Sequence, residues 1–178
     1  MNIKIIEGEA HQLKEKIRSG DCDLAFIRRF LPHKDNQEEA DCFSTIKFTT
    51  DYMVVVLPHD HPLAGEDAVN LSELRGEEFL FLPPDSVLYS LCFKACQQAG
   101  FTPAVTYTGK RAENIVDLVS KGMGISLLMA KPVAYINTQN FVSLVPILPH
   151  LETELVIYYK KGSALSKAAR HFLDFIQQ

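Results

Sequence analysis

The stretch that most constrains the fold covers residues 105–129, because it contains a complete strand, turn, helix, turn and strand. Between residues 111 and 121, apolar side chains recur at the spacing i, i+3, i+4 and i+7, which predicts a helix with one apolar face. Gly122 follows where a helix end favours a left-handed backbone, and residues 125–129 form an almost wholly apolar run, typical of a strand buried on both faces. We therefore expect a right-handed parallel crossover, with the loop before the helix at the carboxyl edge of the sheet.

The composition limits the kinds of protein that this chain can be. Its 178 residues, 47% hydrophobic and 22% charged, are typical of a soluble globular chain with one domain or two small ones. A formal net charge of -4 argues against direct binding of nucleic acid. No apolar run approaches the roughly 18 residues of a membrane span, and the first residues have a strand pattern instead of a signal-peptide pattern. We expect a cytoplasmic protein without membrane contact.

A second strand-and-helix unit is expected near the start of the chain. It comprises a strand at residues 3–6, a helix at 9–19 that ends at Gly20, and a strand at 24–27. The polar and acidic stretch at residues 30–42 predicts an exposed loop.

The sequence pattern in the middle of the chain predicts that the chain passes twice from one domain to the other. Strand-like runs at residues 45–48 and 53–57 are separated by Thr50 and Asp51, where we place the first crossing, and a strand at 142–147 makes the return. The remaining elements are expected at residues 78–82 (strand), 86–98 (helix), 133–136 (helix), 155–159 (strand) and after Ser166 (helix). The expected domains are residues 1–52 with 146–178, and residues 53–145.

The four cysteines show no C-x-x-C spacing: Cys22, Cys42, Cys92 and Cys96. Cys92 and Cys96 lie one helical turn apart, so their thiolates could share a metal, but no nearby His pair completes a site. We expect buried reduced thiols, with no metal and no cofactor.

Short motifs are distributed along the whole chain. They are Glu7-Gly8, Gly20-x-x-Asp23, VVLPHDHPLA at residues 55–64, Leu71-Ser-x-Leu74, Ala99-Gly-Phe-x-Pro103, Val119-x-x-Gly122-x-Gly124 and Leu165-Ser-x-Ala-Ala-x-x-Phe172. In this order and spacing they resemble the effector-binding (co-inducer) domain of LysR-type transcriptional regulators. The resemblance implies two Rossmann-like α/β subdomains, joined by two crossover segments in the type 2 periplasmic-binding-protein fold, with a small effector between them.

The chain departs from the family pattern at its N-terminal end. The winged helix-turn-helix, the linker helix and the first strand-helix unit of the first subdomain are not found, because residues 2–8 resemble the family's second strand. We expect a shortened first subdomain: either the sequence is truncated at this point, or another segment or another molecule fills the gap.

The resemblance also implies site residues in the first subdomain: Glu9, Ala10, Ile27 and Arg28. Arg28 is the best candidate, since a guanidinium can bind a carboxylate with two parallel hydrogen bonds, although a solvated surface arginine is the alternative. Glu9 would repel an anion, which argues against a simple dicarboxylate effector.

The second subdomain offers candidates at two helix starts. Ser86 could donate to a carboxylate or simply cap the helix, Val87 follows it, and Leu88 offers an apolar contact. Lys110 and Arg111 either line the effector site or are solvated.

The sequence contains none of the G-x-S-x-G, P-loop or His-Glu-x-x-His motifs, so we expect a sensor instead of an enzyme. The expected partners are a small organic effector such as an organic acid, a second copy in a homodimer or tetramer, and DNA only through the N-terminal domain of the full regulator. The resemblance places the helix at residues 9–19 near the partner's helix at 87–98. A periplasmic-type solute-binding protein, a redox-sensing regulator acting through cysteine, and an enzyme on a similar scaffold remain alternatives.

Overall fold

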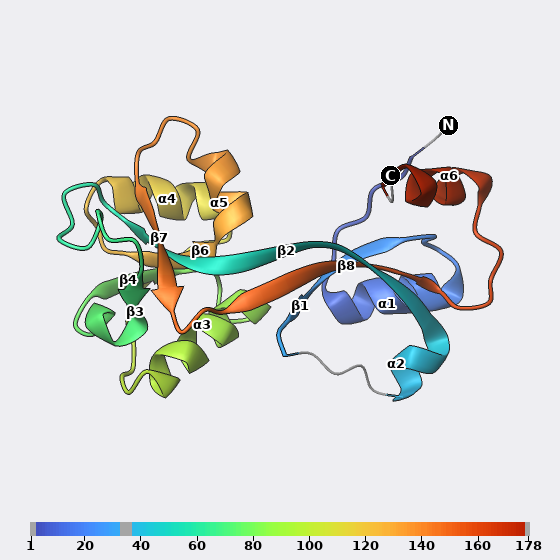
Figure 1. Cartoon of the computed structure of the whole chain (residues 1–178), viewed down its shortest axis with the longest axis horizontal. Helices are drawn as coiled ribbons and strands as arrows, with labels where there is room; N and C mark the ends of the chain where they lie inside the picture. The colour runs from blue at the N-terminus through green and yellow to red at the C-terminus, as the bar shows by residue number, and fades with distance from the viewer. Residues whose placement is uncertain (1–2, 33–36, 177–178) are drawn as a thin grey trace. The chain divides into compact units, whose positions relative to one another are not determined.

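The computed structural model describes residues 3–32 and 37–176, with the elements labelled in Figure 1. The chain divides into two compact units: unit 1, Met1–Thr50 with Thr153–Gln178, and unit 2, Asp51–Glu152. The observed boundaries fall after residues 50 and 152, whereas the sequence placed them after residues 52 and 145.

Two strands, β2 (Phe43–Leu57) and β8 (Glu152–Lys160), contain residues of both units. β2 is continuous, so the prediction of two strands broken at Thr50 and Asp51 was wrong. Asp51 does not interrupt it, because its buried carboxylate accepts the backbone N–H of Lys131 at 3.1 Å and is thereby satisfied within the fold.

Unit 1 contains three helices and one further strand among the described residues: α1 (Ala10–Ser19), β1 (Ala25–Phe30), α2 (Gln37–Cys42) and α6 (Lys167–Ile176). β1 pairs antiparallel with β8, which lies beside β2 in the sheet. Ile17 of α1 packs with Ile27 and Tyr158 in the core of this unit. Ser166 caps α6 as predicted, because its hydroxyl accepts the backbone N–H of Ala169 at 3.1 Å.

Two predictions for unit 1 were wrong. Residues 3–6 form no strand, because no described neighbouring strand offers them hydrogen bonds, and Ile3 and Ile5 are exposed. Part of the loop predicted at residues 30–42 is the helix α2, while residues 33–36 lie outside the described part.

Unit 2 contains most of the regular structure. Its elements are β3 (Val69–Asn70), the 3-10 helix η1 (Leu71–Leu74), β4 (Glu78–Phe81), α3 (Val87–Gln98), β5 (Ala104–Thr108), α4 (Ala112–Ser120), β6 (Ser126–Met129), α5 (Ala130–Ile136) and β7 (Ser143–Leu148). β2 pairs antiparallel with β6 and with β7, and β3 is parallel to β7.

Two hydrophobic cores cover the two faces of the strands in unit 2. Successive residues of β2 alternate between these cores: Met53 and Val55 pack with α3, while Val54 and Val56 pack with α4 and α5. Figure 1 shows the same arrangement, with α3 on one side of these strands and α4 and α5 on the other. Helices on both faces are the reason that β2 is apolar without interruption over its second half.

The predicted crossover is present. β5 is parallel to β4, α4 follows, and the chain returns to β4 through a parallel bridge between Phe79 and Ile125, just before β6. Gly122 has the expected left-handed backbone, with φ 72°. At Gly124, φ is 134°, and an added Cβ would lie 2.5 Å from the carbonyl oxygen of Glu78, so only glycine permits this close approach.

Candidate functional site

The loops that follow β4 and β5 meet at one edge of unit 2. Phe81 is the register partner of Thr108 at the ends of these parallel strands, and the N–H of Gly109 donates to the carbonyl oxygen of Phe81 at 3.0 Å. Each loop leads directly into a helix, α3 after β4 and α4 after β5. The carboxyl edge of the sheet therefore carries two helix N-termini, which is where ligands bind in open α/β sheets.

The N-terminus of α3 brings together three of the predicted site residues. Ser86 is the N-cap, and its Oγ accepts the backbone N–H of Tyr89 at 3.1 Å. This bond confirms the capping role of Ser86 and leaves its hydroxyl hydrogen available to donate. Val87 is 54% exposed, whereas Leu88 is half-buried and packs against both cores of unit 2. Of the two apolar residues, Val87 is therefore the more accessible to a ligand.

The N-terminus of α4 carries the predicted basic pair. Arg111 is the N-cap residue, with an extended backbone and no side-chain capping bond, and Lys110 precedes it. Both side chains are exposed. The positive end of the helix and two cations are thus concentrated beside the N-terminus of α3.

Sequence reasoning missed Tyr107, whose side chain folds over the loop after β5. A Cβ at Gly109 would lie 2.7 Å from Tyr107 Cε1 and 2.9 Å from its hydroxyl oxygen. The aromatic residue two positions before a glycine was the only signal for this packing. The phenol gives this loop one more polar group.

The predicted residues of unit 1 lie on α1 and β1. Glu9 is the N-cap of α1, and its N–H donates to Oε1 of Gln12 at 3.1 Å, while Ala10 packs against the core. Ile27 is only 5% exposed and belongs to that core, so its side chain is not available to a ligand.

Arg28 is anchored on the neighbouring strand. Its Nη1 donates to Oγ1 of Thr153 at 2.7 Å, and Thr153 is fully buried. The bond fixes the direction of a half-buried guanidinium, which distinguishes Arg28 from a freely solvated arginine.

Two cavities lie within unit 1, and none of the nine predicted site residues lines either of them. The part of the chain that the structure describes holds no group of three or more His, Cys, Asp or Glu side chains arranged to bind a metal. It also holds no helix long and apolar enough to cross a membrane.

All four cysteines are free, and the pair on α3 is buried. Burial raises the pKa of Cys92 well above its usual range, with a smaller contribution from the neighbouring Cys96. Burial likewise raises the pKa of Cys96 to about 12. Neither thiol forms the reactive thiolate at neutral pH.

Comparisons with known proteins identify the family. The family described as the LysR substrate binding domain matches residues 1–178. The transcriptional dual regulator GltC of Bacillus subtilis is 33% identical over 173 residues, which cover 97% of this chain and 55% of GltC. A hydrogen peroxide-inducible genes activator of Pectobacterium carotovorum is 26% identical, covering 97% of this chain and 55% of its own length.

A solved structure agrees with this assignment. The C-terminal domain of a probable LysR family regulator from Rhodococcus sp. RHA1 superposes with a TM-score of 0.76 at 28% identity, over 97% of this chain and 82% of that one. The fold is therefore the type 2 periplasmic-binding fold of these regulatory domains, and the chain spans about half the length of the curated regulators that it matches. The chain belongs to the LysR substrate-binding domain family of transcriptional regulators.

Proposed function

We propose that this chain is the sensing part of a transcriptional regulator and that it binds a small organic anion. The proposal rests on one observation, the meeting of the N-termini of α3 and α4 beside the exposed Lys110 and Arg111. Unsatisfied N–H groups and the positive ends of helix dipoles favour an anion, by about 0.3 to 1 kcal/mol for each favourable charge. The Ser86 hydroxyl adds a donor suited to a carboxylate.

In unit 1 we propose Arg28 as the principal effector contact. A guanidinium carries its N–H donors in one plane, and the bond to Thr153 orients that plane. Glu9 at the start of α1 carries a negative charge, which favours a monoanion over a dicarboxylate. The hypothesis that one effector contacts both sets of residues stays a prediction, which the variants below test.

The effector would regulate through unequal affinity for two conformations of the full regulator. A shift from 1:99 to 99:1 requires about 5.5 kcal/mol of differential binding, and a smaller bias suffices for partial activation. We infer that the full protein acts in the cytoplasm, binds DNA through a domain outside this chain, and dimerises with α1 of one copy near α3 of the other. We also infer that the chain senses and does not catalyse, because its relatives are regulators.

A thermal-shift screen of small aliphatic and aromatic acids, followed by titration calorimetry of the hits, tests the proposal. Arg28→Ala and Lys110→Met should each weaken binding about ten-fold or more, because a hydrogen bond to a charged group contributes roughly 1.5 to 3 kcal/mol. Lys121→Met is the matched control, since Lys121 lies at the other end of α4 in an exposed ion pair with Asp117. Unchanged affinity in Arg28→Ala would refute the role of that residue.

Ser86→Asp separates capping from binding. Aspartate caps a helix as well as serine does, so the melting temperature should hold, while its charge should repel an anion from the N-terminus of α3. Retained effector affinity in this variant would contradict the proposed location.

Redox sensing is the second candidate, favoured by the similarity to a hydrogen peroxide-inducible activator. The raised pKa values of Cys92 and Cys96 argue against it, because thiols held protonated react slowly with peroxide. We expect both thiols to resist a thiol-labelling reagent until urea is added, as measured by mass spectrometry. Rapid labelling or peroxide oxidation of this pair in the native chain would favour the redox hypothesis.

A further inference from the structure

The strand β5 contains a bulge directly before the loop of the proposed effector site. In the parallel ladder with β4, Val105 pairs with Phe79. The next residue of β4, Leu80, pairs with Tyr107, so Thr106 is left out of the pairing. Bulges are rare in parallel pairs, and they are frequent beside functional sites, where they redirect a side chain. The side chain that this bulge redirects is that of Tyr107.

The bulge keeps Tyr107 out of the core around α3. Val105 packs into that core, and side chains two positions apart on a regular strand share a face. Without the bulge, Tyr107 would follow Val105 and lie opposite Phe81, which is fully buried in the same core. In the structure, Thr108 is the partner of Phe81, and Tyr107 is 37% exposed. An aromatic side chain that regular strand geometry would bury is therefore kept at the surface.

The ring of Tyr107 lies against the backbone of Gly109. A Cβ on Gly109 would lie 2.7 Å from Cε1 of this ring and 2.9 Å from its hydroxyl oxygen, and Gly109 is buried although it belongs to a loop. The N–H of Gly109 donates to the carbonyl oxygen of Phe81 at 3.0 Å, which fixes the loop to the end of β4. The exposed cations Lys110 and Arg111 follow directly. The phenol is thus held at the edge of the sheet from which α3 and α4 begin.

The hydroxyl group of Tyr107 has no hydrogen-bond partner within residues 3–32 and 37–176. A phenol donates one hydrogen bond and also accepts, so both capacities are open to a ligand. This edge of unit 2 therefore offers two kinds of recognition. The helix N-termini and the two cations suit a negative charge, whereas the uncharged phenol suits a neutral polar group.

We propose that Tyr107 determines the specificity of the effector site and that the effector is a hydroxy acid. Its carboxylate would lie at the N-termini of α3 and α4, and its hydroxyl group would bond the phenol of Tyr107. A hydroxyl group fits this position because it both accepts from a phenol and donates to it. The inference rests on the proposed function, since it requires an organic anion at this edge, and it narrows the class of that anion.

Matched pairs of acids test the role of Tyr107 on the 178-residue chain. Titration calorimetry compares lactate with propionate, and mandelate with phenylacetate. The hydroxylated acid of each pair should bind about three- to ten-fold more tightly, because a site that bonds a hydroxyl group discriminates against the analogue that lacks it. Tyr107→Phe should abolish this preference and leave the affinity for the unhydroxylated acid unchanged, since the ring is retained. Tyr135→Phe is the matched control, because Tyr135 is an exposed tyrosine on α5, and it should keep the preference.

Gly109→Ala provides a second measurement, which tests the position of the phenol. Gly109 has no positive φ, so its backbone conformation is open to alanine, but the added Cβ would displace the ring of Tyr107. The preference for the hydroxylated acid should therefore fall as it does in Tyr107→Phe. The double variant should lose no more than either single variant, because both changes remove the same hydrogen bond.

The outcomes separate this inference from the proposed function. Equal affinity for the two acids of each pair in the wild type, or a preference that survives Tyr107→Phe, would overturn the role of Tyr107 and leave the anion site intact. If neither these four acids nor any acid of the thermal-shift screen binds, the proposed function is refuted, and the role of Tyr107 is refuted with it.

Discussion

Glu154 connects two cationic side chains across the sheet of unit 1. Its Oε1 pairs with Lys47 Nζ at 2.9 Å and its Oε2 with Arg29 Nη2 at 3.2 Å. Its pKa lies below the usual range, chiefly because of the hydrogen bond from Lys47, with a smaller contribution from Arg29 and with burial opposing both. The register of β1 on β8 places Arg29 directly opposite Glu154, so the pairing of the strands creates the contact.

This lowered pKa predicts a pH dependence of stability. A carboxylate whose pKa is lowered in the folded state stabilises the fold at pH values above its ordinary pKa, near 4.5. This stabilisation is lost as the pH falls through the lower pKa of the folded state. Glu154→Gln should therefore reduce the free energy of unfolding by roughly 0.5 to 1 kcal/mol at pH 7. Urea denaturation of the wild type and of Glu154→Gln, at pH 7 and in the acid range, measures the difference in their free energies of unfolding. A difference that stays the same in acid would contradict the lowered pKa of Glu154.

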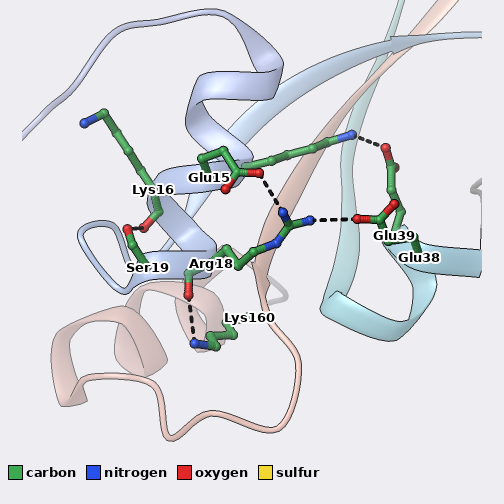
Figure 2. A network of polar contacts seen from close by, with 8 residues as sticks. Glu15, Lys16, Arg18, Ser19, Glu38, Glu39 and Lys160 are labelled. Atoms are coloured by element: carbon green, nitrogen blue, oxygen red, sulfur yellow. Dashed lines mark hydrogen bonds and ion pairs between the residues drawn. The ribbon is translucent and has the colours of Figure 1, made fainter.

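At the scale of elements, the short helix α2 depends on side chains from α1. Lys14 pairs with Glu39 at 2.7 Å, and Arg18 pairs with Glu38 at 3.3 Å and with Glu15 at 2.7 Å. Figure 2 shows the side chain of Arg18 between those of Glu15 and Glu38. Six residues are too few for a stable isolated helix. We infer that these ion pairs hold α2 in place.

Lys14→Met keeps most of the side-chain stem and removes the charge that holds Glu39. Amide hydrogen exchange in α2 should accelerate several-fold, because loss of one partly buried ion pair costs roughly 1 kcal/mol locally. Lys16→Met on the same helix is the control, since the Lys16 side chain points away from α2 in Figure 2. Equal exchange in both variants would show that α2 is held by other contacts.

The errors in the sequence predictions have one physical cause: these segments, like α2, depend on contacts with residues distant in the sequence. Local pattern predicted α3 with its Ser86 cap and α4 with the left-handed Gly122 after it, because periodicity and end signals are encoded within or next to each helix. It failed at α2, at the continuous β2 and at residues 3–6, where distant partners decide the outcome. For the polar site residues, the sequence could predict only the strand ends or helix starts near which they lie. For Tyr107 the only signal was an aromatic residue two positions before a glycine.

At the scale of the whole molecule, the two units differ in how the chain forms them. Unit 2 is one continuous segment, Asp51–Glu152, with two cores of its own, whereas unit 1 combines both ends of the chain. The strands β6 and β7 pair with β2 within unit 2, between residues 53 and 57. The principal contacts of unit 2 are therefore local to its segment.

A fragment of residues 51–152 should consequently fold alone. We expect a single cooperative urea transition and a dispersed amide spectrum, with an m-value smaller than that of the full chain because less surface is exposed on unfolding. The matching mixture of residues 1–50 and 153–178 should show no cooperative transition, because its two pieces are not covalently joined. A fragment 51–152 without cooperative unfolding would mean that unit 2 needs unit 1 to fold.

The close approach at Gly124 sets a limit for any effort to retune this sensor. In a random library selected for a different effector preference, we expect substitutions in the loops after β4 and β5 to be tolerated. Variants with a substitution at residue 124 should be lost during selection. There, a methyl group would meet the carbonyl of Glu78 and force apart the strands that position both loops. Evolvability of the proposed binding edge therefore depends on the hydrogen atom that Gly124 carries where a side chain would otherwise begin.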